Sequence, residues 1–147
     1  MRATRLILFG VAVAALSQAS SAKTDQRGLR SPCLDIRADK PVTVSGRLGR
    51  QIFAGPPNYE SVARGDAEEA AFILELPRRL CADDGGEFIG PGDTFDRVQI
   101  AASTDAMGKV LSAAIGKKIT VRGSAFGAHT GHHHAPLVLF ASSVTVN

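Results

Sequence analysis

The amino-acid sequence predicts a mainly-β protein, a small five-stranded Greek-key barrel of the OB-fold type with one helix between strands three and four. Three observations lead to this prediction. Five segments have strand-like apolar alternation, and the segment between the third and fourth has the period of a helix. "VTVSGRL" and "ITVRGSA" also each run from β-branched residues into a glycine, where a barrel strand can bend. A β-sandwich would lack the helix, and a doubly wound α/β fold would need several.

The first three strands are expected at residues 40–53, 70–76 and 96–102. In the first, Val42, Val44 and Leu48 share one parity, and Gly46 marks a bend. The segment 54–69 contains prolines and glycines and is expected to be a long loop. A short additional strand at 78–82 is an open alternative, and 83–92 is expected to form a turn.

The helix is expected to follow a cap at Ser103 or Thr104 and to end at Gly116. Its apolar stripe would consist of Met107, Val110, Leu111, Ala114 and Ile115. The fourth strand is expected at 117–126 and the fifth at 136–146. The apolar parity changes along the fifth strand, which predicts a bulge at Ser142-Ser143.

The N-terminus has the pattern of a secretory signal peptide. Two arginines precede the apolar run "LILFGVAVAAL", and small residues lead up to Ala22, after which cleavage is expected. The run is shorter than the about 20 residues that a membrane span needs, although an uncleaved anchor is the alternative. We therefore expect a signal peptide at 1–22, a flexible leader at 23–32 and one barrel domain at 33–147, exported to the bacterial periplasm or secreted.

The charge of the exported chain is close to zero, because loss of Arg2 and Arg5 lowers the formal charge from +3 to +1. The chain has no Trp and one Tyr, and most of its phenylalanines fall on inward-facing parities. Proteins that bind single-stranded nucleic acid use stacking aromatics in a basic groove. We therefore expect no nucleic acid partner and no membrane span in the mature chain, and we expect an unknown periplasmic protein or envelope component as partner.

The two cysteines, Cys33 and Cys81, both lie in the expected mature domain. Export places them in an oxidising compartment, where a disulfide between them is expected. Two separate buried thiols are the alternative.

All four histidines lie in "GAHTGHHHAP", residues 127–136. We expect this stretch to connect the last two strands, where OB-folds often form part of a ligand-binding face. Three imidazoles, His129, His132 and His134, with His133 as a possible fourth, would suit zinc or another divalent transition metal. Alternatively the stretch is a rigid turn whose histidines bond to the backbone. No cofactor is certain from the sequence.

The segment "GPPNYES", residues 55–61, contains the only tyrosine in a proline-rich loop. Asn58, Tyr59 and Glu60 are the candidate ligand-binding residues, because a binding loop benefits from being ordered in advance. A turn that packs over the barrel is the alternative. The acidic "DDGGE", residues 83–87, lacks the spaced ligands of a calcium loop and is expected to be a plain turn.

The sequence contains none of the common catalytic signatures. G-x-S-x-G, H-E-x-x-H, C-x-x-C, the P-loop and G-x-G-x-x-G are all absent. We therefore assign no catalytic residue and expect binding rather than catalysis.

Three long strings resemble a known family: "VTVSGRL", "FAGPPNYESVARGDAEEAAFILELPRRLC" and "GKKITVRGSAFGAHTGHHHAPLVL". They are similar to a bacterial secreted family catalogued as domain of unknown function 4431, over most of Cys33 to Val146. Ala135 stands where that family usually has threonine. The resemblance implies an exported barrel in which the tyrosine and histidine segments belong to the family pattern, and it implies no known activity.

Taken together, the sequence predicts an exported periplasmic binding or accessory domain whose ligand is a protein, an envelope component or a metal ion. One alternative is a hydrolase in which a histidine-bound metal activates water, with Glu60 or Asp66 near it. A second alternative is a purely structural accessory domain.

Overall fold

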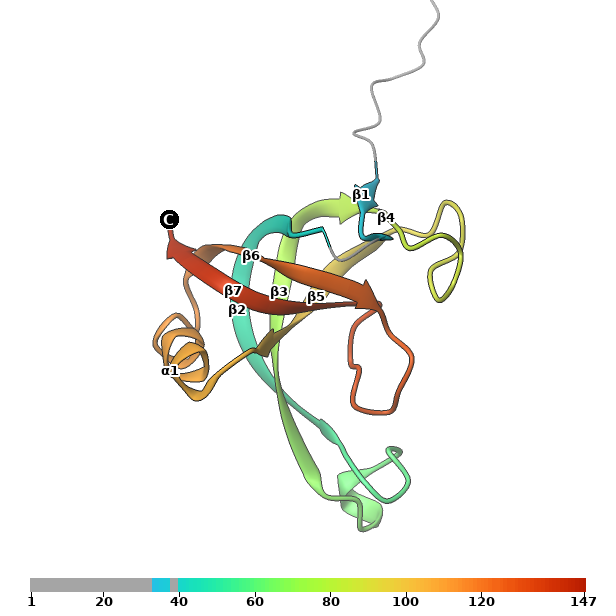
Figure 1. Cartoon of the computed structure of the whole chain (residues 1–147). Coiled ribbons are helices and arrows are strands. Elements are labelled where there is room, and N and C mark those ends of the chain that lie inside the picture. The colour runs from blue at the N-terminus through green and yellow to red at the C-terminus, as the bar shows by residue number, and fades with distance from the viewer. Residues whose placement is uncertain (1–32, 38–39) are drawn as a thin grey trace, which may run out of the picture. The chain divides into compact units, whose positions relative to one another are not determined.

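A computed structural model describes residues 33–37 and 40–147 (Figure 1). The expected signal peptide and leader lie outside these residues. The described part contains a closed barrel of five strands in the order β2-β3-β5-β7-β6, which confirms the predicted mainly-β, OB-like fold. The barrel elements are β2 (Val42–Ala54), β3 (Glu68–Leu80), β5 (Phe95–Ala102), α1 (Asp105–Ala113), β6 (Lys118–Gly127) and β7 (Leu137–Val146).

Four antiparallel pairings, β2–β3, β2–β6, β3–β5 and β6–β7, and one parallel pairing, β5–β7, close the barrel. The order strand, strand, strand, helix, strand, strand is the predicted one. β3 is longer than expected and runs through Pro77, where the register shifts between Glu75 and Leu80. β3 therefore includes residues 78–80 of the additional short strand that the sequence allows at 78–82.

Alternate residues of the strands point inward and form the core. Leu48, Leu74, Val98, Ile119 and Leu139 are among its fully buried members. The helix adds Leu111 and Ala114, and Met107 packs against the core at its edge. The predicted apolar stripe is too wide, because Val110 and Ile115 are 46% and 41% exposed.

The helix begins at its predicted cap but ends early. The side chain of Thr104 accepts a hydrogen bond from the backbone N–H of Met107, while Ser103 donates to the carbonyl of Ala141 in β7. The last helical residue is Ala113, and Gly116 follows in the left-handed conformation with φ of 80°. The chain thus leaves the helix where glycine permits the turn.

The two glycines of the repeated strand pattern are needed where neighbouring backbones approach closely. A Cβ at Gly46 would lie 2.2 Å from the carbonyl oxygen of Glu75, and one at Gly123 would lie 1.8 Å from that of Phe140. Arg122 pairs with Ser143 while Gly123 pairs with Ala141, so the bulge predicted in the last strand is confirmed.

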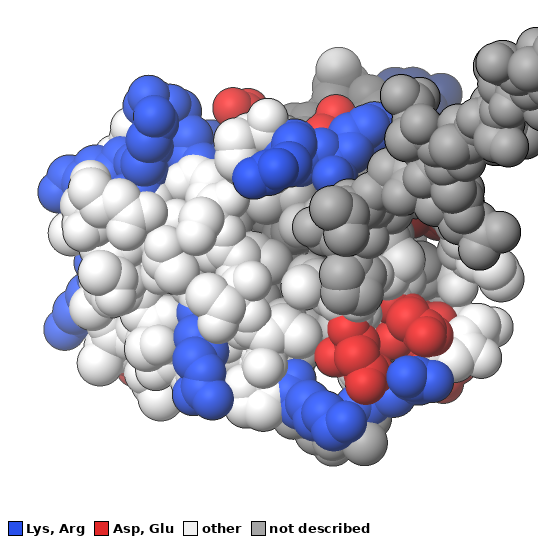
Figure 2. All heavy atoms as spheres, turned by 90° about the horizontal axis from the view of Figure 1, so that it is seen from above, with Lys and Arg blue, Asp and Glu red and all other residues white. Residues whose placement is uncertain are grey.

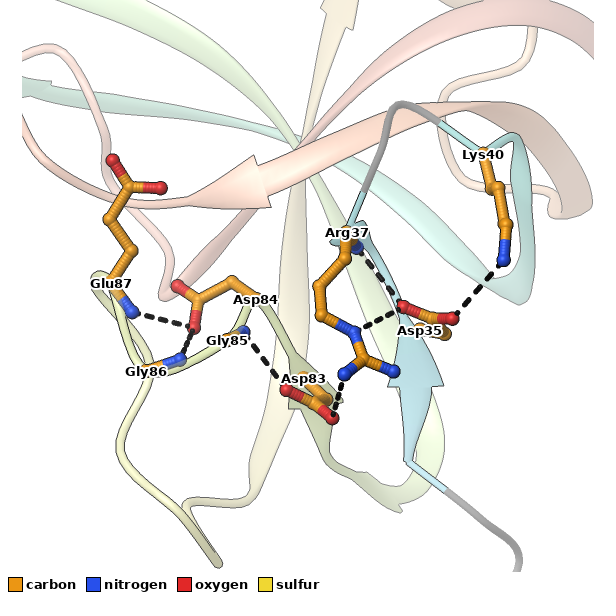
Figure 3. Close-up of polar contacts among 8 residues, drawn as sticks. All are labelled: Asp35, Arg37, Lys40, Asp83, Asp84, Gly85, Gly86 and Glu87. Atoms are coloured by element: carbon orange, nitrogen blue, oxygen red, sulfur yellow. Dashed lines mark hydrogen bonds and ion pairs between the residues drawn. The ribbon is translucent and has the colours of Figure 1, made fainter.

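The predicted disulfide joins Cys33 and Cys81, whose Cα atoms are 4.7 Å apart. Beside it, β1 (Leu34–Asp35) and β4 (Ala82–Asp83) form a two-stranded parallel sheet that the sequence did not predict. Two residues are too few to show a period. Arg37 lies between Asp35 and Asp83 and hydrogen-bonds to Asp35, and this bond is the main reason that the pKa of Asp35 falls to about 2 (Figure 3).

The acidic segment 83–87 is a turn organised by Asp84. One carboxylate oxygen accepts the backbone N–H groups of Gly86 and Glu87 (Figure 3), and the other accepts those of Phe88 and Ile89. The carboxylate is therefore used to hold the turn. Among the described residues, no helix has the length and apolar character that crossing a membrane would require.

Candidate functional site

Two loops meet at one end of the barrel. We call residues 55–67, between β2 and β3, the tyrosine loop, and residues 128–136, between β6 and β7, the histidine loop. β2 and β3 project together beyond the rest of the barrel and carry the tyrosine loop at their tip (Figure 1). The loops are joined directly, because the Tyr59 hydroxyl lies 2.9 Å from Nε2 of His132.

The tyrosine loop is built around Asp66, whose side chain is buried. Its carboxylate accepts the backbone N–H groups of Asn58, Glu60 and Ser61 at 2.8–2.9 Å. These hydrogen bonds, first among them the one from Ser61, lower the pKa of Asp66. Asp66 is therefore a structural residue of the loop.

The three predicted ligand-binding residues have different environments. The Asn58 amide donates to Asp66 at 3.1 Å and is turned into its own loop. Glu60 is exposed and pairs with Arg64 at 3.0 Å, on the 3-10 helix Val62–Arg64. Tyr59 is 37% exposed and presents its hydroxyl to the histidine loop. The structure thus leaves Tyr59 and Glu60 accessible.

Tyr59 is held in an uncommon backbone conformation, with φ of 60°. Its ring packs against Gly131 so closely that a Cβ there would lie 2.9 Å from the ring. The ring of His132 meets it edge-on, with centroids 5.1 Å apart. The glycine of "HTGHHH" is therefore needed because the tyrosine ring occupies the space of its missing side chain.

Glu69, near the start of β3, completes the site. Its Oε2 lies 2.8 Å from Nδ1 of His132, so Tyr59, His132 and Glu69 form one hydrogen-bonded chain. Burial raises the pKa of Glu69, but the hydrogen bond from His132 and the nearby His134 imidazole outweigh this effect and the pKa is lowered. Sequence reasoning missed Glu69, because no local pattern links it to a histidine 63 positions away.

His134 faces the other oxygen of the same carboxylate. Its Nε2 is 3.3 Å from Glu69 Oε1, but the alignment is too poor for a hydrogen bond. Its side chain is only 8% exposed and stacks on Phe53 with centroids 4.1 Å apart and rings parallel within 2°. His134 therefore anchors the histidine loop to the projecting β2 strand.

Gln99 on β5 fixes the same part of the loop. Its amide oxygen accepts the backbone N–H of His134 at 2.6 Å, and its nitrogen donates to the carbonyl of His132 at 3.0 Å. Its cross-strand neighbours on the outer face, Ile73 and Val138, are 1% and 2% exposed although they lie outside the core cluster. We attribute their burial to the histidine loop, which Gln99 holds over this face.

The other two histidines, His129 and His133, pack against Phe88 and Phe126 and not against Glu69. Nδ1 of His133 accepts the backbone N–H groups of His129 and Thr130, and burial lowers the pKa of His133. Nδ1 of His129 donates to the carbonyl of Gly127 at 2.9 Å, and its ring stacks on Phe88. Both imidazoles thus serve the conformation of the loop.

The candidate metal ligands are not brought together. His132 and His134 converge on Glu69, whereas His129 lies with His133 beside Phe126. Within the described parts of the chain, no group of three or more His, Cys, Asp or Glu side chains is placed to hold a metal ion. The physical reason is that their rings pack on different neighbours, His134 on Phe53 and His129 on Phe88.

The expected inward placement of most phenylalanines is wrong. Phe72 and Phe95 contribute to the core, but the remaining described phenylalanines do not; these are Phe53, Phe88, Phe126 and Phe140. Phe126 and Phe140 lie on the outer parity of β6 and β7, where their rings are 5.5 Å apart. Phe88 and Phe140 are 49% and 44% exposed, so aromatic surface surrounds the histidine loop.

Charged side chains are not concentrated in one basic groove on the face that Figure 2 shows. Lys and Arg are spread over this face, and the largest group of Asp and Glu lies at its lower right (Figure 2). A shallow hollow of about 340 Å³ takes in Arg47, Glu75 and Lys118, and none of the tyrosine-loop or histidine-loop residues lines it. Tyr59 and the side chain of His132 are exposed at the site.

Residues 97–145 match the model of a family described as "Domain of unknown function (DUF4431)". The resemblance to that family is confirmed for this segment, which contains the histidine loop but not the tyrosine loop. No curated protein matches the chain.

Solved structures share the fold at low identity. A small single-stranded DNA-binding protein from Streptomyces coelicolor is 15% identical over 74% of this chain and 94% of that chain, with a TM-score of 0.37. The Plasmodium falciparum SSB in complex with ssDNA is 16% identical over 72% and 90%, with a TM-score of 0.34. The expectation that nucleic acid is not a partner is contradicted by these neighbours and is withdrawn; part of its basis, the inward phenylalanines, is also wrong.

Proposed function

We propose that this chain is an exported binding domain of the bacterial envelope, whose ligand surface is formed by the tyrosine and histidine loops. The observation that carries the proposal is the direct contact of these loops through Tyr59, His132 and Glu69. OB-fold proteins commonly place ligands between the loops at these two positions of the barrel.

The surface is ordered before any ligand arrives. Asp66 satisfies three backbone N–H groups of the tyrosine loop, and Gln99 holds two backbone groups of the histidine loop. A loop that is already fixed loses less conformational entropy on binding. Rigid loops with exposed polar and aromatic side chains favour a recognition role.

The accessible side chains indicate the kind of ligand. Tyr59 offers part of its ring, the His132 side chain is 57% exposed, and Glu60 and Arg64 are 65% and 70% exposed. Such an exposed surface of mixed polarity suits a macromolecule better than a small molecule, which usually needs a concave pocket. No group of three or more ligating side chains comes together among the described residues, so we favour a protein or polymer of the envelope over a metal ion.

Export is supported by the signal pattern and by the disulfide. Both cysteines of the chain are joined in the Cys33–Cys81 disulfide. Disulfides persist in the periplasm and outside the cell and are rare in the cytosol. We therefore place the working protein outside the cytoplasm.

The test is to record ¹⁵N–¹H correlation spectra of the domain during titration with three probes: soluble peptidoglycan fragments, zinc chloride and an oligodeoxythymidylate. We expect shifts concentrated in residues 55–67 and 128–136 with the peptidoglycan fragments. The variant Glu60→Ala/Arg64→Ala should weaken binding, while Lys109→Ala, an exposed change on α1, should not. Saturation with the oligonucleotide or zinc alone would contradict an envelope ligand, and shifts centred on Arg47 or absence of binding would contradict the proposed surface.

A further inference from the structure

We infer that Tyr59 is an activated nucleophile that accepts acyl groups from esters presented at this surface, with His132 as its general base and Glu69 as a positioning residue. This inference goes beyond the proposed binding function, although the phenol lies on the same surface. It rests on the order in which three polar groups are connected.

The connected groups are a hydroxyl, an imidazole and a carboxylate. Tyr59 Oη lies 2.9 Å from His132 Nε2, and His132 Nδ1 lies 2.8 Å from Glu69 Oε2. A hydroxyl is activated for attack when an adjacent base takes its proton and a third group orients that base. Three separate segments supply these groups, and the fold brings them into series.

The chemistry of Glu69 determines the direction of each hydrogen bond. The pKa of Glu69 is lowered, so the carboxylate is ionised near neutral pH and can only accept. His132 therefore donates from Nδ1 to Glu69, and the neutral form of the imidazole presents a lone pair at Nε2. The Tyr59 hydroxyl donates to this form of His132, which is the arrangement that general-base catalysis requires.

The nucleophile is held in place by its own loop. Tyr59 has a left-handed backbone with φ of 60°, and one side of its ring packs against Gly131. A non-glycine residue in this conformation persists where the surroundings enforce it, and such residues concentrate at functional sites. The hydrogen bonds of Asp66 to Asn58 and Glu60, on either side of Tyr59, supply this enforcement.

The phenol is also accessible to an acyl donor. Tyr59 is 37% exposed, and the side chain of His132 is 57% exposed. An ester carbonyl can therefore approach Oη from solvent without a cavity. The buried side of the site is occupied by Glu69, which is only 24% exposed and is kept away from the donor.

In the proposed reaction, an acyl group passes from an ester to Tyr59. Tyr59 Oη forms a bond to the acyl carbon while its proton passes to His132 Nε2, and the imidazolium is stabilised by Glu69. The tetrahedral intermediate then expels the alcohol oxygen, which takes the proton from His132. The products are an aryl ester on Tyr59 and a free alcohol, and Glu69 remains ionised throughout.

The test uses p-nitrophenyl acetate as the probe, with the folded disulfide-linked domain near neutral pH and acetylation of Tyr59 measured by peptide mass spectrometry. Tyr59 in the same chain unfolded by urea, with its disulfide intact, is the reference. Base assistance of this kind contributes about 100-fold, so we expect Tyr59 to react about 100-fold faster in the folded protein. His132→Gln should reduce the rate to the unfolded value, and Glu69→Gln should reduce it partly.

The matched control is Lys109→Gln, an exposed change on α1 that lies outside both loops. It should leave the rate unchanged. The wild-type rate should fall at acid pH, and the rate of His132→Gln should not show this fall, because glutamine has no basic nitrogen. A purely structural histidine would not produce this difference in the pH profile.

Equal rates in folded and unfolded protein, or a rate that His132→Gln leaves unchanged, would overturn the inference. Tyr59→Phe separates it from the proposed binding function, because that variant cannot be acylated but keeps the ring. If Tyr59→Phe still shows the binding shifts with peptidoglycan fragments, the binding surface stands whatever the outcome of the acylation test.

Discussion

The ring of Tyr59 occupies the space that a side chain at position 131 would need. A Cβ at Gly131 would lie 2.9 Å from Cγ of the ring, closer than real Cβ atoms come to any neighbour. The two unusual strings "GPPNYES" and "GAHTGHHH" are therefore parts of one packed structure. The conformation of each loop depends on the other, so a substitution in one loop should alter the structure of both.

Gly131→Ala tests this relationship. Overpacking of this kind costs about 1–3 kcal/mol, so we expect the free energy of unfolding to fall by that amount. The control is Gly108→Ala on α1, where a Cβ meets only Ala102 at 3.8 Å. That change should stabilise the protein by about 1 kcal/mol, because alanine is the better helix former.

Urea unfolding measures both variants. The chain has one tyrosine and no tryptophan, so tyrosine emission reports on Tyr59 alone. We expect Gly131→Ala to alter this emission in the native state, and Gly108→Ala to leave it unchanged. Equal stability of Gly131→Ala and the wild type would show that the loops separate without cost.

Asp66→Asn should destabilise the tyrosine loop and change the acid response of the protein. The pKa of Asp66 is lowered in the folded state by its backbone hydrogen bonds. Its contribution to stability is therefore complete above the ordinary value of 3.8 and is lost as the pH falls from there through the lower folded pKa. At neutral pH, we expect a loss of about 1–3 kcal/mol, because an amide accepts the N–H groups less well than a carboxylate.

The measurement is the free energy of unfolding from neutral pH to strongly acid pH. The wild type should lose stability below the ordinary aspartate value more steeply than Asp66→Asn does. Glu60→Gln is the comparison, because Glu60 is exposed and pairs only with Arg64. A parallel pH dependence in wild type and Asp66→Asn would contradict the role given to Asp66.

His133 should produce a separate effect at milder pH. Its pKa is lowered from 6.5 by burial and by the neighbouring histidines. Below 6.5 the unfolded chain binds a proton more readily than the folded one, so stability is lost as the pH falls through this range. Protonation also removes the acceptor at Nδ1 that binds the N–H groups of His129 and Thr130.

We expect thermal unfolding to show a fall in stability as the pH drops below 6.5. His133→Asn should reduce this fall, because asparagine does not titrate, while the aspartate effect at lower pH should remain. His129→Asn is the matched histidine variant for the comparison. A pH response that His133→Asn leaves intact would assign the effect to another group.

Much of the barrel could be predicted because it follows from residue periods. Alternation located the strands, the i, i+3, i+4 pattern located the helix, and the parity change near Ser142 located the bulge. The two-residue strands β1 and β4 carry no period and were missed. The width of the buried stripe on α1 was overestimated. The period of apolar residues shows which of them share a face of the helix, but it does not show how much of that face contacts the barrel.

The site was predicted only in part, because its geometry depends on strand register. The two loops were recognised from composition, but Glu69 reaches His132 across 63 residues through the register of β3. The metal set also assumed that nearby histidines point one way. In the structure, His134 stacks on Phe53 while His129 stacks on Phe88, so the two imidazoles do not converge.

Zinc titration of the untagged domain addresses the histidine loop directly. Because His132 and His134 engage Glu69 and His133 bonds to the backbone, we expect only weak zinc binding. The double variant His132→Ala/His134→Ala should lose stability without metal, since it removes the stacking on Phe53 and the bond to Tyr59. A one-to-one, submicromolar zinc complex that the double variant loses would instead show that the loop rearranges into a metal site.

Loss of the disulfide should weaken the barrel through the unfolded state. The bond closes a loop with a sequence separation of 48 residues, for which loop-closure entropy predicts about 4 kcal/mol. We expect Cys33→Ser/Cys81→Ser to lower the free energy of unfolding by up to that amount. The barrel should still form, because β1 and β4 lie outside its five-stranded closure.

Mass spectrometry of protein expressed with its full N-terminus would test export and the disulfide together. Cleavage after Ala22 should leave Lys23 as the first residue, and the periplasmic product should be two hydrogens lighter than its reduced form. Protein kept in the cytoplasm by deletion of 1–22 is the control and should have free thiols. An unprocessed, reduced chain from the full-length gene would contradict export, and with it the envelope ligand that we propose.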